Sequence, residues 1–260
     1  MKRLFANSAA LALLTLLVAP PAVAELSNAT IVGPGIRLRP AYDGSAAHHV
    51  ELVPIVRYLG QPWFLRSTQG VLEGGARFEL APGLHAGVQI AYEPGRNASE
   101  SAFLKNHNVD DIDSGASVGA HLEWDNKLGP VPITLLVRAR QDTNTDHGAQ
   151  ADLRLSVGVF QRGPLAVGAF TQATWANAKG TRTLYGVDPQ QSAATHLPGY
   201  AAGSGLLFAS AGLLYSIDLG SKWAVVGNFE ARHLQGDARN SPLVERSMNY
   251  YATVGAVYRF

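Results

Sequence analysis

Apolar and polar residues alternate along most of this chain. In residues 222–232, Trp223 and Phe229 fall on one face, while Asn228 and Glu230 fall on the other. Because successive side chains of a β-strand point to opposite faces, this pattern predicts a strand with one apolar and one polar surface. The same alternation recurs in residues 72–80, 117–124 and 152–159. An all-β protein is therefore predicted, although alternation alone also fits a soluble sandwich with one wet face.

The lengths of the connections separate these two folds. The predicted strands are 30–40, 48–58, 62–68, 70–80, 84–93, 115–126, 131–141, 150–161, 164–175, 205–218, 222–234 and 248–260. The long connections between them, which are the fifth, seventh, ninth and eleventh, are 94–114, 142–149, 176–204 and 235–247. Every even-numbered connection is short, which is typical of a transmembrane up-and-down antiparallel β-barrel with short periplasmic turns.

An even strand number places both the N- and the C-terminus on the periplasmic side. Most of the predicted strands have about 10 residues, which suits a tilted membrane crossing. The pattern predicts about 12 strands, and 10 or 11 also fit because residues 62–68 carry a weak signal.

The last predicted strand ends on aromatic residues. Tyr258 and Phe260 share a face with three small or β-branched residues of the same strand. Aromatic side chains gather where a barrel meets the membrane–water boundary. A terminal Phe after an alternating strand resembles the signal by which the barrel-assembly machinery recognises outer-membrane barrels. The alternative is an ordinary last strand of a soluble domain.

The first 24 residues have the features of a cleaved signal peptide. Lys2 and Arg3 precede an apolar run over residues 9–19, and Ala22-Val23-Ala24 supplies a small-residue cleavage site. A run of eleven apolar residues is too short to span a bilayer, which needs about 20. We therefore expect residues 25–260 to form a single β-barrel domain in the outer membrane of a Gram-negative cell.

The composition agrees with a membrane barrel. The chain is 47% hydrophobic and 16% charged, and it has a formal net charge of +1 and no cysteine. The charged fraction is below the ~25% of soluble domains, as expected if lipid covers the outward face. The lack of cysteine excludes a disulfide scaffold and thiol chemistry, and the small net charge argues against nucleic-acid binding.

The strand phases also predict which charged side chains enter the lumen. Eight arginines and six carboxylates are expected there: Arg37, Arg39, Glu51, Arg57, Glu73, Arg77, Glu79, Glu123, Arg138, Arg140, Asp152, Arg154, Glu230 and Arg232. Twelve strands lie between the filled 8-stranded barrels and the open 16–18-stranded porins. Paired arginines and carboxylates favour a filled or narrow lumen over the alternative of a weakly anion-selective pore.

Candidate catalytic and metal-binding motifs fail on inspection. Residues 142–148 resemble a calcium loop, but the glycine stands one place late and Leu153 occupies the position of the bidentate Glu. His48 and His49 are adjacent on a strand and point apart. His121 and His233 have no accompanying Gly-x-Ser-x-Gly sequence for a barrel lipase. We therefore expect no enzyme activity, no cofactor and no metal site.

The longest loop carries a family resemblance. Residues 185–206 look like the hallmark loop of the MltA-interacting protein family (MipA/OmpV). Residues 39–45 with Val53-Pro54 resemble that family's first hairpin, and 241–245 with 258–260 resemble its ending. His196 departs from the pattern, because the family usually has Gly before Leu-Pro. The matching loop residues are Tyr185, Gly186, Val187, Asp188, Ser192, Leu197, Pro198, Tyr200 and Gly205.

The resemblance implies a non-enzymatic outer-membrane scaffold. The family's namesake is described as bridging a lytic transglycosylase and a murein synthase, two enzymes that remodel peptidoglycan during cell-wall growth. Other members are described as adhesins or stress-related antigens. Three functions therefore stay open from the sequence: a scaffold for periplasmic enzymes, a small pore, and a surface adhesin that would use the loops 94–114 and 176–204.

Overall fold

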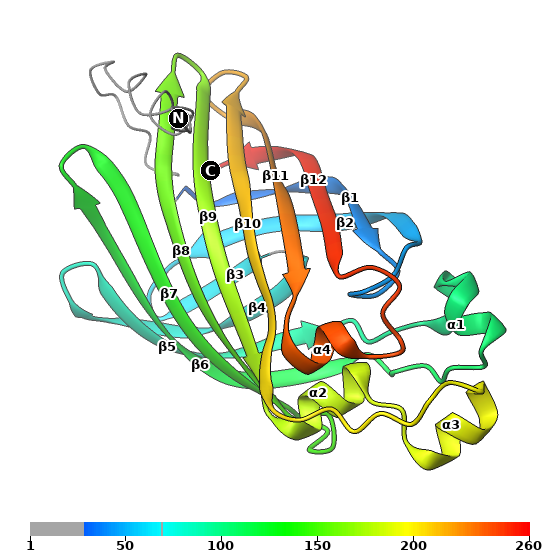
Figure 1. Cartoon of the computed structure of the whole chain (residues 1–260). Coiled ribbons are helices and arrows are strands. Elements are labelled where there is room, and N and C mark those ends of the chain that lie inside the picture. The colour runs from blue at the N-terminus through cyan, green and yellow to red at the C-terminus, as the bar shows by residue number, and fades with distance from the viewer. Residues whose placement is uncertain (1–28, 69) are drawn as a thin grey trace, which may run out of the picture.

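Alternating side chains and short even-numbered turns bring each strand against its neighbours in sequence. The computed structural model describes residues 29–68 and 70–260, which form a closed antiparallel barrel (Figure 1). Its strands are β1 (Ile31–Pro40), β2 (His48–Leu59), β3 (Trp63–Thr68), β4 (Val71–Ala81), β5 (Leu84–Glu93), β6 (Gly115–Leu128), β7 (Val131–Asp142), β8 (Ala149–Arg162), β9 (Leu165–Ala176), β10 (Gly205–Asp218), β11 (Trp223–Leu234) and β12 (Met248–Arg259).

Pairing of β1 with β12 closes the barrel, and Ile31 stands opposite Arg259. The start of β1 and the end of β12 therefore lie at one end of the barrel, which also carries the short turns; we call it the short-turn end (Figure 1). The prediction of a 12-stranded up-and-down antiparallel barrel is confirmed, with every strand boundary within two residues. The predicted signal peptide, residues 1–24, lies outside the described residues.

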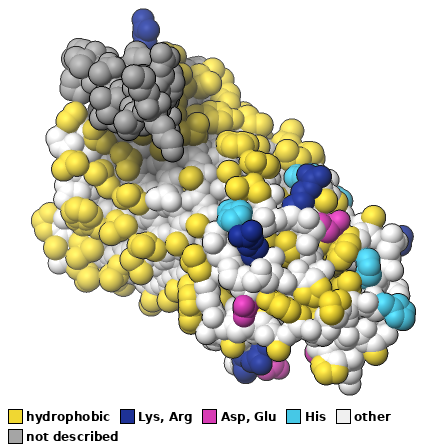
Figure 2. Space-filling view, viewed as in Figure 1, with side chains coloured by type: hydrophobic (Ala, Val, Ile, Leu, Met, Phe, Trp, Pro, Cys, Tyr) yellow, Lys and Arg dark blue, Asp and Glu magenta, His cyan; other side chains and the backbone are white. Residues whose placement is uncertain are grey.

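The outer surface of the barrel wall is apolar. Side chains of alternate residues in most strands are exposed and large, among them Val88, Ile90, Leu122, Val137 and Leu153. Figure 2 shows hydrophobic side chains spread over the wall. Charged and histidine side chains gather toward the end opposite the short-turn end. An exposed apolar surface of this extent is stable only when lipid or another apolar phase covers it.

The long loops contain short helices that the sequence analysis treated as loops only. These are η1 (Ala98–Glu100), α1 (Ala102–Asn106), α2 (Ala178–Tyr185), α3 (Pro189–Thr195) and α4 (Gly236–Asn240). They lie at the end of the barrel opposite the short turns, and we call this layer, residues 41–47, 94–114, 177–204 and 235–247, the cap (Figure 1). Among residues 29–68 and 70–260, no helix is long and apolar enough to cross a membrane.

The cap has its own apolar core. Tyr185, Leu207 and Phe208 pack with Leu234 and Ala238, which joins α2 and α4 to the ends of β10 and β11. A second cluster joins three of the long loops through Leu104, Val109, Val187 and Leu243. These contacts hold the loops against one another and against the barrel end.

Hydrogen bonds tie the same loops together. Ser241 Oγ donates to the Tyr185 carbonyl at 2.6 Å, and Tyr42 Oη donates to the Leu243 carbonyl at 2.8 Å. Arg96 Nη1 donates to the Leu184 carbonyl at 3.0 Å. Burial raises the pKa of both Tyr42 and Tyr185 above the ordinary value, so both phenols stay neutral at physiological pH.

Candidate functional site: a charge network across the lumen

Strand register brings oppositely charged side chains together inside the barrel. Arg138 of β7 stands opposite Asp152 of β8, and its Nε donates to Asp152 Oδ2 at 2.8 Å. Its Nη1 reaches across the lumen to Glu73 Oε2 of β4 at 2.7 Å. All three side chains are buried. Arg138 therefore links two walls that are separated by two intervening strands.

Arg66 extends this network from β3. Its Nε donates to Glu73 Oε1 at 2.6 Å, and its Nη1 is hydrogen-bonded to Glu123. Glu123 also pairs with Arg77 at 3.4 Å, and Gln89 Nε2 donates to Glu73 at 3.1 Å. Glu73 and Glu123 thus each have at least two charged or polar partners, which offsets their desolvation.

Arg66 is not among the residues predicted for the lumen, because residues 62–68 carry only a weak strand signal. The signal was present in the alternation itself. Trp63 and Leu65 are exposed on the outer wall, whereas Phe64 and Arg66 are buried. Applying the period of two to this short strand would have placed Arg66 in the lumen.

A second group of ion pairs lies nearer the cap. Arg39 pairs with Glu51 at 2.9 Å and with Glu100 of η1 at 3.0 Å. Arg232 pairs with Asp43 at 2.7 Å and with Glu230 at 3.2 Å. The cap is therefore joined to the lumen by charge as well as by apolar packing.

Other predicted members have different surroundings. Arg140 pairs with Glu93 at 2.8 Å, and Arg37 pairs with Glu51 at 3.5 Å. Arg57 donates to the Ala29 carbonyl, and Arg154 donates to Gln172 and lies over the ring of Phe170.

Glu79 lies outside the network. Its side chain is exposed and accepts a hydrogen bond from the Gly83 amide at 3.2 Å. The register of β4 with β5 shifts between Glu79 and Ala81, where the strand reaches the short-turn end. Glu73 and Arg77 of the same strand are buried, whereas Glu79 lies at the edge of the barrel.

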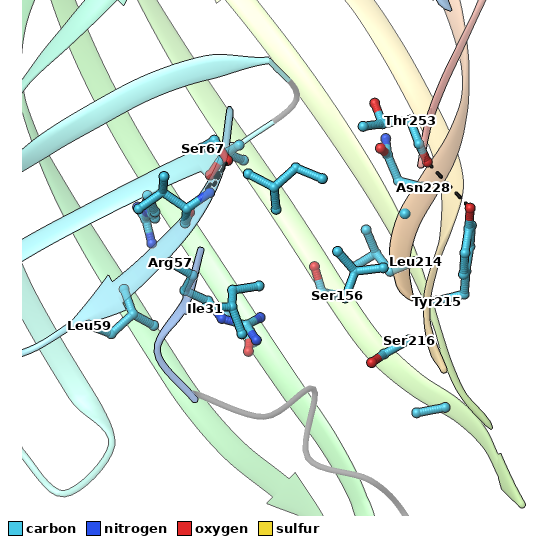
Figure 3. A pocket seen from close by; sticks show the side chains of 18 of the residues that line it. Ile31, Arg57, Leu59, Ser67, Ser156, Leu214, Tyr215, Ser216, Asn228 and Thr253 are labelled. Carbon is cyan, nitrogen blue, oxygen red and sulfur yellow. Dashed lines mark hydrogen bonds between the residues drawn. The ribbon is translucent and has the colours of Figure 1, made fainter. Parts of the chain in front are cut away.

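The network lies between two cavities in the lumen. One, of about 620 Å³, opens toward the short-turn end and is lined in part by Arg57, Arg66 and Arg154 (Figure 3). The other, of about 690 Å³, lies toward the cap and is lined in part by Arg138 and Arg140. Arg66 of the first lining and Arg138 of the second both pair with Glu73. This chain of side chains narrows the lumen between the cavities.

Tyr258 and Phe260, predicted as the barrel-assembly signal, contact other aromatic side chains. Phe260 is 79% exposed, and its ring meets that of Tyr258, which in turn meets Trp223. The three form an aromatic group at the short-turn end. In the described part of the chain, no three His, Cys, Asp or Glu side chains form a cluster that could hold a metal ion.

The family loop folds into α3 and its flanks within the cap. Asp188 caps α3, where its side chain accepts from the Gln191 amide at 2.8 Å. Ser192 Oγ donates to the Leu197 carbonyl at 2.7 Å, and Val187 pairs with Tyr200 in an isolated bridge. Gly186 ends α2, Pro198 follows Leu197 in the turn after α3, and Gly205 begins β10.

A closed antiparallel barrel with an apolar outer wall and a charged lumen defines the class of outer-membrane β-barrels. The chain belongs to the MltA-interacting protein MipA family, whose model matches residues 32–260. The resemblance inferred from the loop and the two flanking motifs is therefore confirmed, and so is an outer-membrane location.

Comparison with solved structures finds outer-membrane proteins of low sequence identity. An outer membrane channel from Pseudomonas putida F1 is 12% identical, with 94% of this chain and 100% of that chain covered and a TM-score of 0.51. The NanC porin is also 12% identical, with 89% and 100% covered and a TM-score of 0.48. LpxR from Salmonella typhimurium is 10% identical, with 88% and 100% covered and a TM-score of 0.46. The search of curated proteins gives no match.

Proposed function

We propose that this barrel is a non-enzymatic outer-membrane scaffold for a lytic transglycosylase, with its short-turn end in the periplasm. The observation that carries the proposal is the match of residues 32–260 to a family described as MltA-interacting proteins. By the resemblance, a murein synthase is the second partner. Both chain ends face the same compartment as these enzymes in this orientation, and the cap faces outward.

The geometry supports a role for the barrel ends. Buried ion pairs cross the lumen between the two cavities, so the surfaces available to a macromolecule are the rim and the cap. At the short-turn end, Leu80, Leu128, Leu219 and Phe260 are large, apolar and exposed. Exposed apolar side chains beside polar turns are typical of interaction sites.

Retention of a purified lytic transglycosylase by the immobilised, refolded barrel tests the scaffold. We expect Leu128→Asp with Leu219→Asp to lower retention at least tenfold, because charges would replace apolar contacts at the rim. Thr145→Asp, on the exposed loop at the cap end, is the matched control and should retain the enzyme. No retention by the wild-type barrel at low salt would contradict the scaffold, and a murein synthase is the second enzyme to test.

A small pore is the second candidate, and one observation favours it. The two cavities share part of their lining, including Arg37, Val53, Ser67 and Gly70, so the lumen is not filled along its whole length. A rearrangement of the side chains between them would join about 620 Å³ and about 690 Å³ into one passage. Planar-bilayer conductance distinguishes this candidate from a closed scaffold.

A further inference from the structure

One strand of the barrel is paired on one side for only a small part of its length. β2 pairs with β1 from His48 to Arg57. On its other side it pairs with β3 through Arg57, Tyr58 and Leu59 alone, whereas every other pair of neighbouring strands shares at least six positions. Within the described chain, residues 48–56 of β2 thus have a strand partner on the β1 side only.

This open edge lies in the apolar part of the wall. Val50 and Leu52 point outward and are 69% and 83% exposed. Their partners on β1, Leu38 and Ile36, are exposed apolar residues as well. The edge is therefore at the level that lipid covers, and no water is available from the hydrocarbon side.

The backbone of β2 shows which polar groups face the gap. The Val56 amide donates to Ser67 Oγ of β3 at 3.0 Å, and Ser67 Oγ donates back to the Val56 carbonyl at 3.4 Å. In an antiparallel strand, alternate residues direct their backbone groups to the same side. The amides and carbonyls of Val50 and Leu52 therefore point toward the gap as well. Such groups are tolerated at membrane depth where they line a water-filled cavity.

The cavity near the cap reaches this gap. Its lining includes Leu52, Leu72 and Tyr92, whose side chains are exposed on the outer wall, and also Arg37 and Glu51 on the lumen side. The cavity therefore meets the wall at the gap beside β2, where residues of both faces contribute to its lining. We call this gap the side window.

The borders of the side window come from four segments. β2 forms one side, residues 70–72 at the β3–β4 hairpin form the second, and residues 92–94 at the end of β5 form the third. Toward the cap, the Glu100 carbonyl lies 2.5 Å from His49 Nε2, and the Glu100 carboxylate accepts from Arg39 at 3.2 Å. The window thus opens sideways into the membrane, and η1 closes it on the cap side.

Arg37 is a cation at the inner border, and it makes fewer hydrogen bonds to the described residues than Arg39 does. Its one described carboxylate contact, to Glu51, is long at 3.5 Å. Arg39, by contrast, bonds to Glu51, to Glu100 and to two backbone carbonyls. A Cβ added to Gly70 would lie 1.8 Å from Arg37 Nη1, so the guanidinium lies against the hairpin that borders the window.

The edge is unsuited to pairing with another β-strand. Pro54 stands on the open edge of β2 and has no backbone amide to donate. Proline is one of the residues by which natural sheets prevent strand addition. The gap in the wall and the arginine behind it fit a molecule with an apolar tail and an anionic head instead.

We propose that the side window binds a single-chain anionic amphiphile from the bilayer. Its carboxylate or phosphate head pairs with Arg37 in the cavity, where a guanidinium forms two parallel hydrogen bonds with such an anion. Its tail lies over Val50, Leu52, Leu72 and Tyr92 on the outer wall. A cavity of about 690 Å³ has the size of known small-molecule sites.

Photocrosslinking of the refolded full-length barrel in phosphatidylcholine nanodiscs tests this site. The probes are a fatty acid and an alkyl phosphate that carry a diazirine near the head, and a fatty alcohol of equal length is the neutral control. Peptide mapping should show at least fivefold enrichment of both anionic probes on residues 50–54, 70–72 and 92–94 over the rest of the wall. Even labelling around the barrel, or equal enrichment of the alcohol, would overturn the proposal.

Two variants and one control locate the site. Arg37→Gln should remove the enrichment because the head loses its cation. Val53→Trp should also remove it, because Val53 lines the cavity near the window and the larger side chain fills the space. Arg154→Gln is the matched control in the other cavity and should keep the enrichment. Heat-modifiable gel mobility shows that each variant is folded, and enrichment that survives in a folded Val53→Trp barrel would contradict the site.

Hydrogen exchange checks the open edge independently. Without amphiphile, the amides of Val50 and Leu52 should exchange rapidly, while that of Val56 should be protected by Ser67. Slow exchange at Val50 and Leu52 would show that the edge is already paired and would overturn the side window.

Discussion

At the scale of single residues, the stability of the charge network in the lumen depends on the pairing of its buried charges. Arg138 is buried between Glu73 and Asp152, and both carboxylates are buried too. A buried ion pair contributes little compared with a well-packed apolar pair, but removal of one partner leaves an uncompensated charge in a low dielectric. The side chains of the network therefore depend on one another far more than surface ion pairs do.

Arg138→Ala should lower the free energy of unfolding by about 3–5 kcal/mol, because two buried carboxylates lose their shared cation. Urea unfolding in lipid vesicles at neutral pH measures the change. Lys179→Ala is the control, because Lys179 and Asp146 form an exposed pair at 3.5 Å and its loss should cost at most about 1 kcal/mol. Equal stability of both variants would show that Arg138 does not compensate Glu73 and Asp152.

The same scale shows what a sequence can and cannot predict about the site. The inward phase of Glu73, Arg138 and Asp152 follows from the period of two alone, and their contacts agree with it. The partners do not follow from phase, since the link between Glu73 and Arg138 spans the lumen and depends on the curvature of the closed sheet. Glu79 shows the other limit, because phase does not tell where the lumen ends.

At the scale of elements, strands and helices differ in how clearly the sequence marks them. A strand of 10–14 residues repeats its alternation five times or more, which is why the strand bounds were predicted closely. The cap helices have three to eight residues, about two turns at most, so no helical period develops. Their capping residues were still visible. Asp188-Pro189-Gln190-Gln191 contains the N-cap, the Pro and the N3 Gln of a capping box.

His196 stands where the family usually has Gly, and its backbone geometry suits glycine. It ends α3 with φ of 58°, in the left-handed region, where glycine has no Cβ penalty. His196→Gly should therefore stabilise the α3 segment by about 0.5–1 kcal/mol. The amide of residue 196 donates to the Ser192 carbonyl. Slower native-state hydrogen exchange of this amide and its neighbours would measure the gain in stability.

Asn108 is the control for this prediction. It also has a positive φ, of 50°, but asparagine adopts the left-handed region more readily than most residues. Asn108→Gly should therefore change exchange in its own loop by less than His196→Gly does in α3. A destabilised α3 in the His196→Gly barrel would mean that the His196 side chain makes a contact worth more than the backbone strain.

At the scale of the whole molecule, the barrel separates two solvents. The outer wall is apolar because lipid covers it. Many of the few charged residues of the chain lie in the lumen instead. Leu122 stands near the middle of β6 opposite Val137 of β7, and both face outward. Leu122→Arg should destabilise the barrel in vesicles by about 2–4 kcal/mol, which is the cost of arginine at the bilayer midplane.

Urea unfolding in vesicles measures that cost, and position within the barrel supplies the control. Thr145→Arg, on an exposed loop of the cap end, should be close to neutral because water solvates the new charge there. Equal stability of the Leu122→Arg and wild-type barrels would show that this face of the wall is not in contact with lipid.

The ion pairs across the lumen also make a prediction about conduction. Arg138 and Arg140 together contact Glu73, Glu93 and Asp152, and both arginines line the cavity near the cap. Replacing both arginines with alanine removes two large side chains and leaves the carboxylates without these cations. The passage should become wider and its field negative. In planar bilayers the wild-type barrel should conduct weakly, and the Arg138→Ala, Arg140→Ala barrel should conduct several times more and prefer cations.

A double change at the exposed Lys179 and Arg182 of the cap tests for a general effect of lost charge, and it should leave conductance as in the wild type. Unchanged conductance and selectivity in the lumen variant would show that the barrier to ions lies elsewhere, with the cap as the next structure to test.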